Sequence, residues 1–119
     1  MAFAREVELE LSPDLHAPGR VRAVLEAEFA DLGDALFAAQ VIASELVTNA
    51  ILHGEPPVRL EVRNTETGLH VAVHDQRAEV GRPTPASRGL RIVDTLSADW
   101  GVTPTATGKY FWADVAAPH

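Results

Sequence analysis

The sequence contains no cysteine and is poor in basic residues. The absence of cysteine excludes a disulfide framework and any metal site built from thiolate ligands. Lys and Arg together number 10 against 17 Asp and Glu, so the formal net charge is −7 at pH 7. This balance argues against a protein that binds the phosphate backbone of a nucleic acid, and it would suit a basic protein partner.

The sequence also shows no segment that would direct it to a membrane. It begins with an alternating segment instead of the charged, apolar and small-residue regions of a signal peptide. We expect no window to be long and apolar enough to span a membrane. With 119 residues, of which 46% are hydrophobic, we expect one globular domain over residues 1–119, located in the cytoplasm.

Several enzyme motifs are missing. The sequence has no P-loop, no dinucleotide-binding glycine motif, no nucleophile elbow and no zinc-protease motif. His70 and His74 lie four residues apart on an expected strand, and at roughly 3.3 Å per residue they are about 13 Å apart, too far to bind one metal ion together. We interpret them as part of a solvated strand face, and neither a catalytic triad nor a zinc site finds support.

Periodicity and turn residues predict the order strand, two helices, two strands, loop, short helix, two strands. The expected helices cover residues 18–30, 35–53 and 87–96, and the expected strands cover 5–11, 58–63, 69–73, 98–102 and 109–116. Pro18 is expected to open the first helix, Asp34 to cap the second and Gly54 to end it. The order predicts an α+β fold, a two-layer sandwich with helices on one face of a mixed, mainly antiparallel sheet.

The second helix carries two polar residues within an apolar pattern. Glu45 and Asn49 are four residues apart and therefore share one helix face. A carboxylate there can accept a proton from water or a hydroxyl, and a carboxamide oxygen can bind a hard cation. For an isolated pair, a solvated helix face is the simpler interpretation.

Two further features follow this helix in the sequence. Asp75 ends an apolar strand where a long loop, residues 76–87, begins. Its carboxylate could accept hydrogen bonds from an exocyclic amine such as that of adenine, or it could simply initiate the loop. The run Ser87-Arg88-Gly89-Leu90 then opens a helix, where free N–H groups can bind an anion and Arg88 could add positive charge, although many helices begin in this way.

Together these segments resemble the N, G1 and G2 boxes of the GHKL (Bergerat-fold) ATPases. Within that superfamily, SELVTNAILHG is similar to the N box of the anti-sigma factor serine kinases, E-x-x-T-N-A-x-x-H. Trp100-Gly101 and Gly108-Lys109-Tyr110-Phe111-Trp112 resemble segments of their short, stand-alone bacterial relatives. The resemblance covers nearly the whole chain, and its N box is the most specific part.

The resemblance implies that the protein binds ATP and Mg²⁺. Asn49 would bind the Mg²⁺ ion, and Glu45 would act as general base on water or on a partner's serine hydroxyl. Asp75 would bind the adenine amino group, and Gly89 would let the backbone approach the phosphates beneath a lid formed by residues 76–87. The implied ATP-binding residues are Asn49, Asp75, Gly81, Ser87, Arg88, Gly89 and Leu90.

Five features depart from the family pattern. Arg77 occupies the first glycine position after the aspartate, Gly81 comes late, and Ser87 stands where a glycine usually precedes Gly89. Lys109 lies where many relatives carry threonine, and the lid is shorter than in the best-known anti-sigma kinases. A side chain at position 77 adds bulk where the backbone would approach adenine.

The resulting hypothesis is an ATP- and Mg²⁺-binding anti-sigma factor serine/threonine kinase. It would bind a sigma factor and phosphorylate an anti-sigma factor antagonist, without direct contact to nucleic acid or membrane; its relatives often form homodimers. The alternative, motivated by Arg77, Ser87 and the short lid, is a regulator that keeps the fold but acts by protein contact alone. A detached histidine-kinase ATPase domain is less favoured, because we expect no second domain with a phosphoaccepting histidine.

Overall fold

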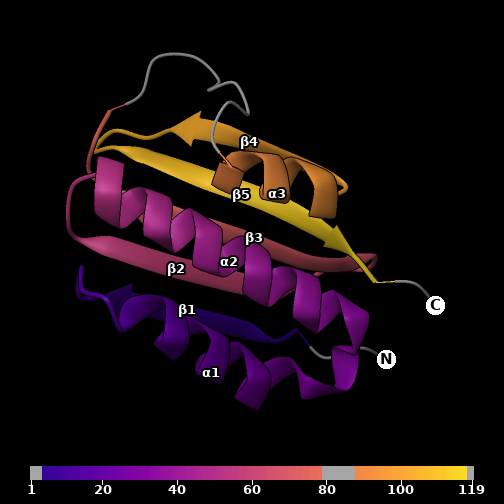
Figure 1. Cartoon of the computed structure of the whole chain (residues 1–119). Helices are drawn as coiled ribbons and strands as arrows, with labels where there is room; N and C mark the ends of the chain where they lie inside the picture. The colour runs from indigo at the N-terminus through magenta and orange to yellow at the C-terminus, as the bar shows by residue number, and fades with distance from the viewer. Residues whose placement is uncertain (1–3, 79–87, 118–119) are drawn as a thin grey trace.

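The computed structural model describes residues 4–78 and 88–117, and Figure 1 shows their arrangement. The strands are β1 (Glu6–Leu11), β2 (Val58–Asn64), β3 (Gly68–Asp75), β4 (Asp99–Pro104) and β5 (Lys109–Ala116). The helices are α1 (Ala17–Phe29), α2 (Asp34–His53) and α3 (Arg88–Leu96), with a short 3₁₀ helix, η1 (Ala30–Leu32), between the first two. The predicted order of elements is confirmed.

The five strands form one sheet in the order β1-β2-β3-β5-β4, and the helices cover one face of it (Figure 1). All four strand pairings among the described residues are antiparallel. The α+β sandwich is therefore confirmed, but the expectation of a mixed sheet is wrong. The reason is the connection through α3: it brings β4 to the edge of the sheet, and the β4–β5 hairpin then places β5 antiparallel to β3.

Alternation along the strands separates a buried face from a solvated one. The side chains of Leu60, Val62, Val71 and Val73 point into the core, and the residues between them point to the other face. Asp75 continues the buried series of β3, two residues beyond Val73. Strand alternation alone therefore places this carboxylate on the helix-covered face of the sheet.

Helix α2 is the central element of the helical layer. It contains an 18-residue window with mean hydropathy 1.6, which is long and apolar enough to cross a membrane, so the expectation that no such window exists is wrong. The helix is apolar because it packs in the core, where eight of its residues are buried: Ala35, Leu36, Ala39, Ile42, Ala43, Leu46, Val47 and Ala50. The helix packs against α1, α3 and strands β2, β3 and β5, as expected for the core helix of a sandwich.

The helix ends agree with the expectations from the sequence, with one exception. Pro18 lies in the first turn of α1, where its missing N–H has no helical partner to lose. Gly54 ends α2, and its N–H donates to the carbonyl of Ala50 at 2.8 Å. Asp34, however, is the first residue of α2 and not its cap; Gly33, with φ of 55°, holds the cap position, and Asp34 contributes negative charge to the first turn.

Candidate functional site

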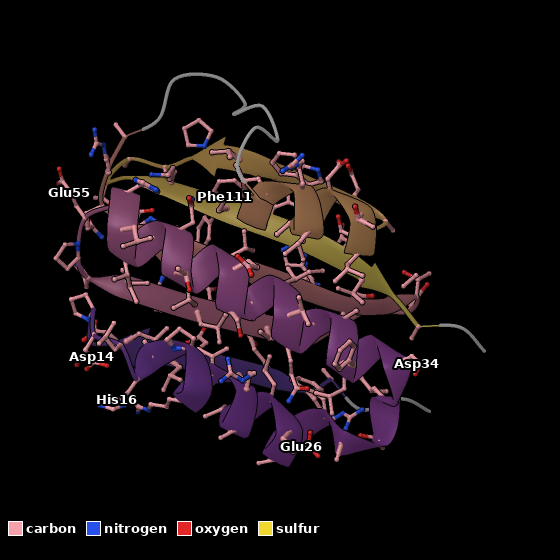
Figure 2. The ribbon with its side chains drawn as sticks, in the orientation of Figure 1. Asp14, His16, Glu26, Asp34, Glu55 and Phe111 are labelled. Atoms are coloured by element: carbon pink, nitrogen blue, oxygen red, sulfur yellow. The ribbon has the colours of Figure 1, made fainter. Side chains whose placement is uncertain are left out.

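The C-terminal half of α2 forms one wall of the candidate site. Glu45, Asn49 and His53 recur every four residues and so lie on one face of the helix, toward α3. Figure 2 shows Glu55 at this end of α2 and Phe111 beside it, whereas Asp34 marks the opposite end of the helix. The site therefore lies where α2 ends, β3 ends and α3 begins.

Two small cavities lie along this wall. One, of about 150 Å³, is lined by Glu45, Thr48, Asn49, Leu52, His53, Gly89 and Leu90. The other, of about 170 Å³, is lined by Asn49, His53, Gly54, Asp75, Leu90, Lys109 and Phe111. Asn49, His53 and Leu90 line both, so the two cavities adjoin around them. Each is smaller than the roughly 300–1,000 Å³ typical of small-molecule pockets.

Glu45 faces the start of α3. A Cβ atom added at Gly89 would lie 2.5 Å from Glu45 Oε2, so the carboxylate occupies the space that glycine leaves free. The positive end of the α3 dipole favours a negative charge at this position. This contact between the N-box glutamate and Gly89 was not predicted from the sequence, and a side chain at position 89 would require the Glu45 carboxylate to move.

Asn49 lies between the two cavities and is partly buried. Its carboxamide makes no hydrogen bond to the described residues in the structure. Its oxygen and the nearby Glu45 carboxylate are hard oxygen donors of the kind that Mg²⁺ prefers, usually together with waters and substrate phosphates. The donor set therefore fits a magnesium ion held partly by a nucleotide.

Asp75 is 2% exposed, and its carboxylate is already hydrogen-bonded. Its Oδ1 atom accepts from the backbone N–H of Arg77 at 2.8 Å, a local turn contact, and from the N–H of Glu55 at 3.4 Å. The same oxygen accepts from Lys109 Nζ at 3.1 Å. Asp75 lines one of the cavities, and its carboxylate is bound there by protein groups.

Lys109 is the partner of Asp75 in the register of β3 and β5. The Asp75 and Lys109 side chains are only 3% and 5% exposed, so the two charges form a buried ion pair. Lys109 Nζ also donates to the carbonyl oxygen of Arg77 at 3.1 Å. Buried charges are retained in proteins when they are paired and hydrogen-bonded in this way.

Two more residues shape this corner. The Arg77 guanidinium donates to the carbonyl oxygen of His53 at 3.2 Å, so this exposed side chain neutralises the C-terminal end of α2. A Cβ at Gly54 would lie 2.5 Å from Asp75 Cγ and 2.6 Å from the Ala50 carbonyl oxygen. Gly54 is therefore required for the close approach of α2 to Asp75.

The structure brings together Glu45, Asn49, Asp75, Gly89 and Leu90, five of the predicted site residues. Gly81 and Ser87 lie outside the described residues, as does most of the predicted lid. Arg88 is the first residue of α3, and its side chain also lies outside the described part of the chain.

Sequence reasoning missed several lining residues as site members. Thr48 and His53 could have been found, because both belong to the N-box pattern and His53 continues the four-residue spacing of Glu45 and Asn49. Lys109 was noted only as a departure from the family. Its position directly opposite Asp75 depends on the β3–β5 register, which has no local signal in the sequence.

A larger recess, of about 490 Å³, lies elsewhere. It is on the open face of the sheet, beside the stacked rings of His70 and Trp112. This face also carries a carboxylate cluster, in which Glu6 and Glu8 are exposed and Glu61 is partly buried. His74 is 8% exposed and contacts Tyr110 and Thr105, so the expectation that it is solvated is wrong. None of the predicted site residues lies here.

Comparisons with known proteins support the fold. No protein-family model matches the sequence, and no curated protein matches it. Among solved structures, the crystal structure of the RsbU and RsbW domains of Rv1364c from Mycobacterium tuberculosis is similar, with a TM-score of 0.71 at 19% sequence identity. The match covers 96% of this chain and 33% of that one, so the chain spans about a third of the solved chain's length. The resemblance noted in the sequence is thereby confirmed at the level of the fold.

Proposed function

We propose that the protein binds ATP with Mg²⁺ and transfers a phosphoryl group to a serine or threonine of a partner protein. The observation that carries the proposal is the convergence of Glu45, Asn49, Asp75 and Gly89 from three separate elements onto adjoining cavities. Phosphoryl transfer needs mainly positioning and neutralisation of charge, and this set supplies a metal ligand, a base and a helix start.

Each residue has a role that follows from its position. Asn49 would ligate the Mg²⁺ ion that neutralises the phosphates. Glu45 would accept the proton of the attacking hydroxyl, and the N–H groups at the start of α3 would bind phosphate oxygens. For these amides to bind phosphate, the Glu45 carboxylate must turn away from Gly89. The Glu45 side chain is flexible and can make this movement.

The sequence resemblance and the match to a chain with an RsbW domain support a regulatory setting. We propose a cytoplasmic anti-sigma factor kinase that binds a sigma factor and phosphorylates its antagonist. The net charge of −7 is compatible with a basic surface on the partner.

The first test is calorimetric titration with ATP, with and without Mg²⁺. We expect Mg²⁺-dependent binding in the native chain and a loss of about tenfold or more in affinity for Asn49→Ala. Glu66→Gln, a change in an exposed turn far from the site, is the control and should bind like the native chain. Equal Mg²⁺-dependent affinity in Asn49→Ala would rule out the metal role of this residue.

A second variant separates binding from transfer. Glu45→Gln should bind ATP at least as well as the native chain but lose phosphorylation of the partner by about 10²-fold or more, since it removes the base. A Glu45→Gln protein with full transfer activity would show that the base lies elsewhere.

A second candidate function is a regulator that acts by protein contact without nucleotide. The buried Asp75–Lys109 pair favours it, because the Asp75 carboxylate, which was predicted to bind the adenine amino group, already has a charged partner. The absence of any heat or thermal stabilisation at millimolar ATP would favour this candidate over the kinase.

A further inference from the structure

We infer that Lys109 determines the nucleobase selectivity of this site: it competes with a ligand amine for Asp75, so that the native chain distinguishes poorly between 6-amino and 6-oxo purines. The inference rests on the proposed nucleotide-binding function and deepens it. It is based on the buried ion pair in the cavity wall, in which Lys109 Nζ lies 3.1 Å from Asp75 Oδ1.

The ion pair is fixed by the sheet. Asp75 and Lys109 are register partners on β3 and β5, and both side chains point to the helix-covered face. Neighbouring residues of the same buried series, Val73 and Phe111, are packed in the core. The two charges therefore cannot separate without a change in the sheet or in the lysine side chain.

The carboxylate has little space for another donor. Oδ1 already accepts three hydrogen bonds, from the N–H groups of Arg77 and Glu55 and from the Lys109 ammonium. Oδ2 faces the end of α2, where a Cβ on Gly54 would come within 2.7 Å of it. Three donors already share Oδ1, so a purine amine at this atom would have to displace one of them.

Displacing the lysine is unfavourable. The ammonium makes a charge-assisted hydrogen bond, which is roughly twice as strong as one from a neutral amine, and its displacement would leave two buried charges apart. A ligand amine therefore gains little from Asp75 while Lys109 is present. A 6-oxo purine, which lacks that amine, should therefore bind almost as tightly as a 6-amino purine.

The test compares ATP with inosine triphosphate, which carries a 6-oxo group in place of the amine, by titration in the presence of Mg²⁺. For the native chain we expect dissociation constants within about threefold of each other. Lys109→Met keeps the length of the side chain and removes its charge, and it should tighten ATP binding and raise the preference for ATP to about tenfold or more. Lys109→Arg keeps the charge, so its dissociation constants for the two nucleotides should stay within about threefold of each other, whatever its absolute affinity.

The variants also test whether the effect passes through Asp75. The double variant Asp75→Asn with Lys109→Met should lose the preference that Lys109→Met gains. A native chain that prefers ATP by tenfold or more would overturn the inference, and this result does not depend on the folding of any variant. So would a folded Lys109→Met protein that binds both nucleotides as the native chain does.

Failure of the proposed function gives a different result. If neither nucleotide binds to the native chain, to Lys109→Arg or to a folded Lys109→Met, both the nucleotide site and the inference fall. If nucleotides bind and only the selectivity pattern is wrong, the inference alone falls.

Discussion

Gly89 lies against the end of the Glu45 side chain in the candidate site. In Gly89→Ala the new Cβ would lie 2.5 Å from Glu45 Oε2, the end of a flexible side chain that can rotate away. We expect the free energy of unfolding to change by less than about 1 kcal/mol, since alanine also favours the helix. Phosphoryl transfer should fall by about tenfold or more, because the added methyl group hinders the approach of phosphate oxygens to the N–H groups at the start of α3. Thermal unfolding and a phosphorylation assay on the same preparations check both expectations.

Gly54→Ala gives the contrast to this variant. Its Cβ would lie 2.6 Å from the Ala50 carbonyl oxygen, which belongs to the helix backbone and cannot move alone. This variant should therefore lose stability as well as function. If Gly89→Ala unfolds as easily as Gly54→Ala, the start of α3 is less tolerant than the contact suggests.

The buried ion pair leads to a second prediction about single residues. Lys109→Met and Asp75→Asn should each lower the free energy of unfolding by about 3 kcal/mol, because each leaves one buried group without its partner. In the double variant, the free energy of unfolding should fall by clearly less than the sum of the two single losses. Denaturant unfolding of the four proteins measures this coupling, and simple additivity would mean that the pair does not interact energetically.

At the scale of elements, α2 combines two functions in one helix. Its apolar stripe packs against the sheet, and its polar face forms the site. Leu46 is 1% exposed, so Leu46→Ala should lower the free energy of unfolding by about 3 kcal/mol. Phe37→Ala, at a position of the same helix that is 67% exposed, is the matched control and should change it by less than about 0.5 kcal/mol. Comparable losses in the two variants would contradict the assignment of α2 as a core helix.

The sequence was sufficient to predict most elements of the fold. Alternation in β1, β2 and β3 and the apolar stripe of α2 are local signals, and they predicted the elements and the buried face. The antiparallel direction of β5 was not local, since it depends on where α3 leads the chain. For the same reason the approach of Lys109 to Asp75, 34 residues apart, could not be predicted.

In the candidate site, too, some features have a local signal in the sequence and others do not. Glu45 and Asn49 lie on one helix, and their common face follows from the helical period alone. The approach of Gly89 to Glu45 was not predicted, because the contact joins α2 to α3 and has no local signal in the sequence. Residues 79–87, which include Gly81 and Ser87, remain predictions.

At the scale of the whole molecule, one ion pair links the start of the chain to the helical layer. Arg5, just before β1, contacts Asp31 of η1 through two hydrogen bonds of 2.7 and 3.1 Å. The hydrogen bond from Arg5 holds the pKa of the Asp31 carboxyl below its usual value of 3.8. A carboxyl whose pKa is lowered by folding stabilises the fold above its unfolded pKa, and this stabilisation is lost as the pH falls through the folded value.

Asp31→Asn tests this linkage. The variant should melt at a slightly lower temperature than the native chain at pH 7, since the contact is exposed and screened by solvent. As the pH falls below 3.8 the difference should shrink, because the carboxyl of the native chain becomes protonated and its ion pair with Arg5 is lost. Melting curves from pH 2 to pH 7 measure it, and a difference that grows in acid would contradict the sign.

The open sheet also has two free edges, β1 and β4, which could in principle recruit strands from other copies of the chain. Each edge carries an obstacle to this. The three glutamates of β1, Glu6, Glu8 and Glu10, are exposed and would repel an identical strand, and β4 ends at Pro104, which has no N–H group to donate. The same two strands that end the sheet therefore oppose its extension by further copies of the chain.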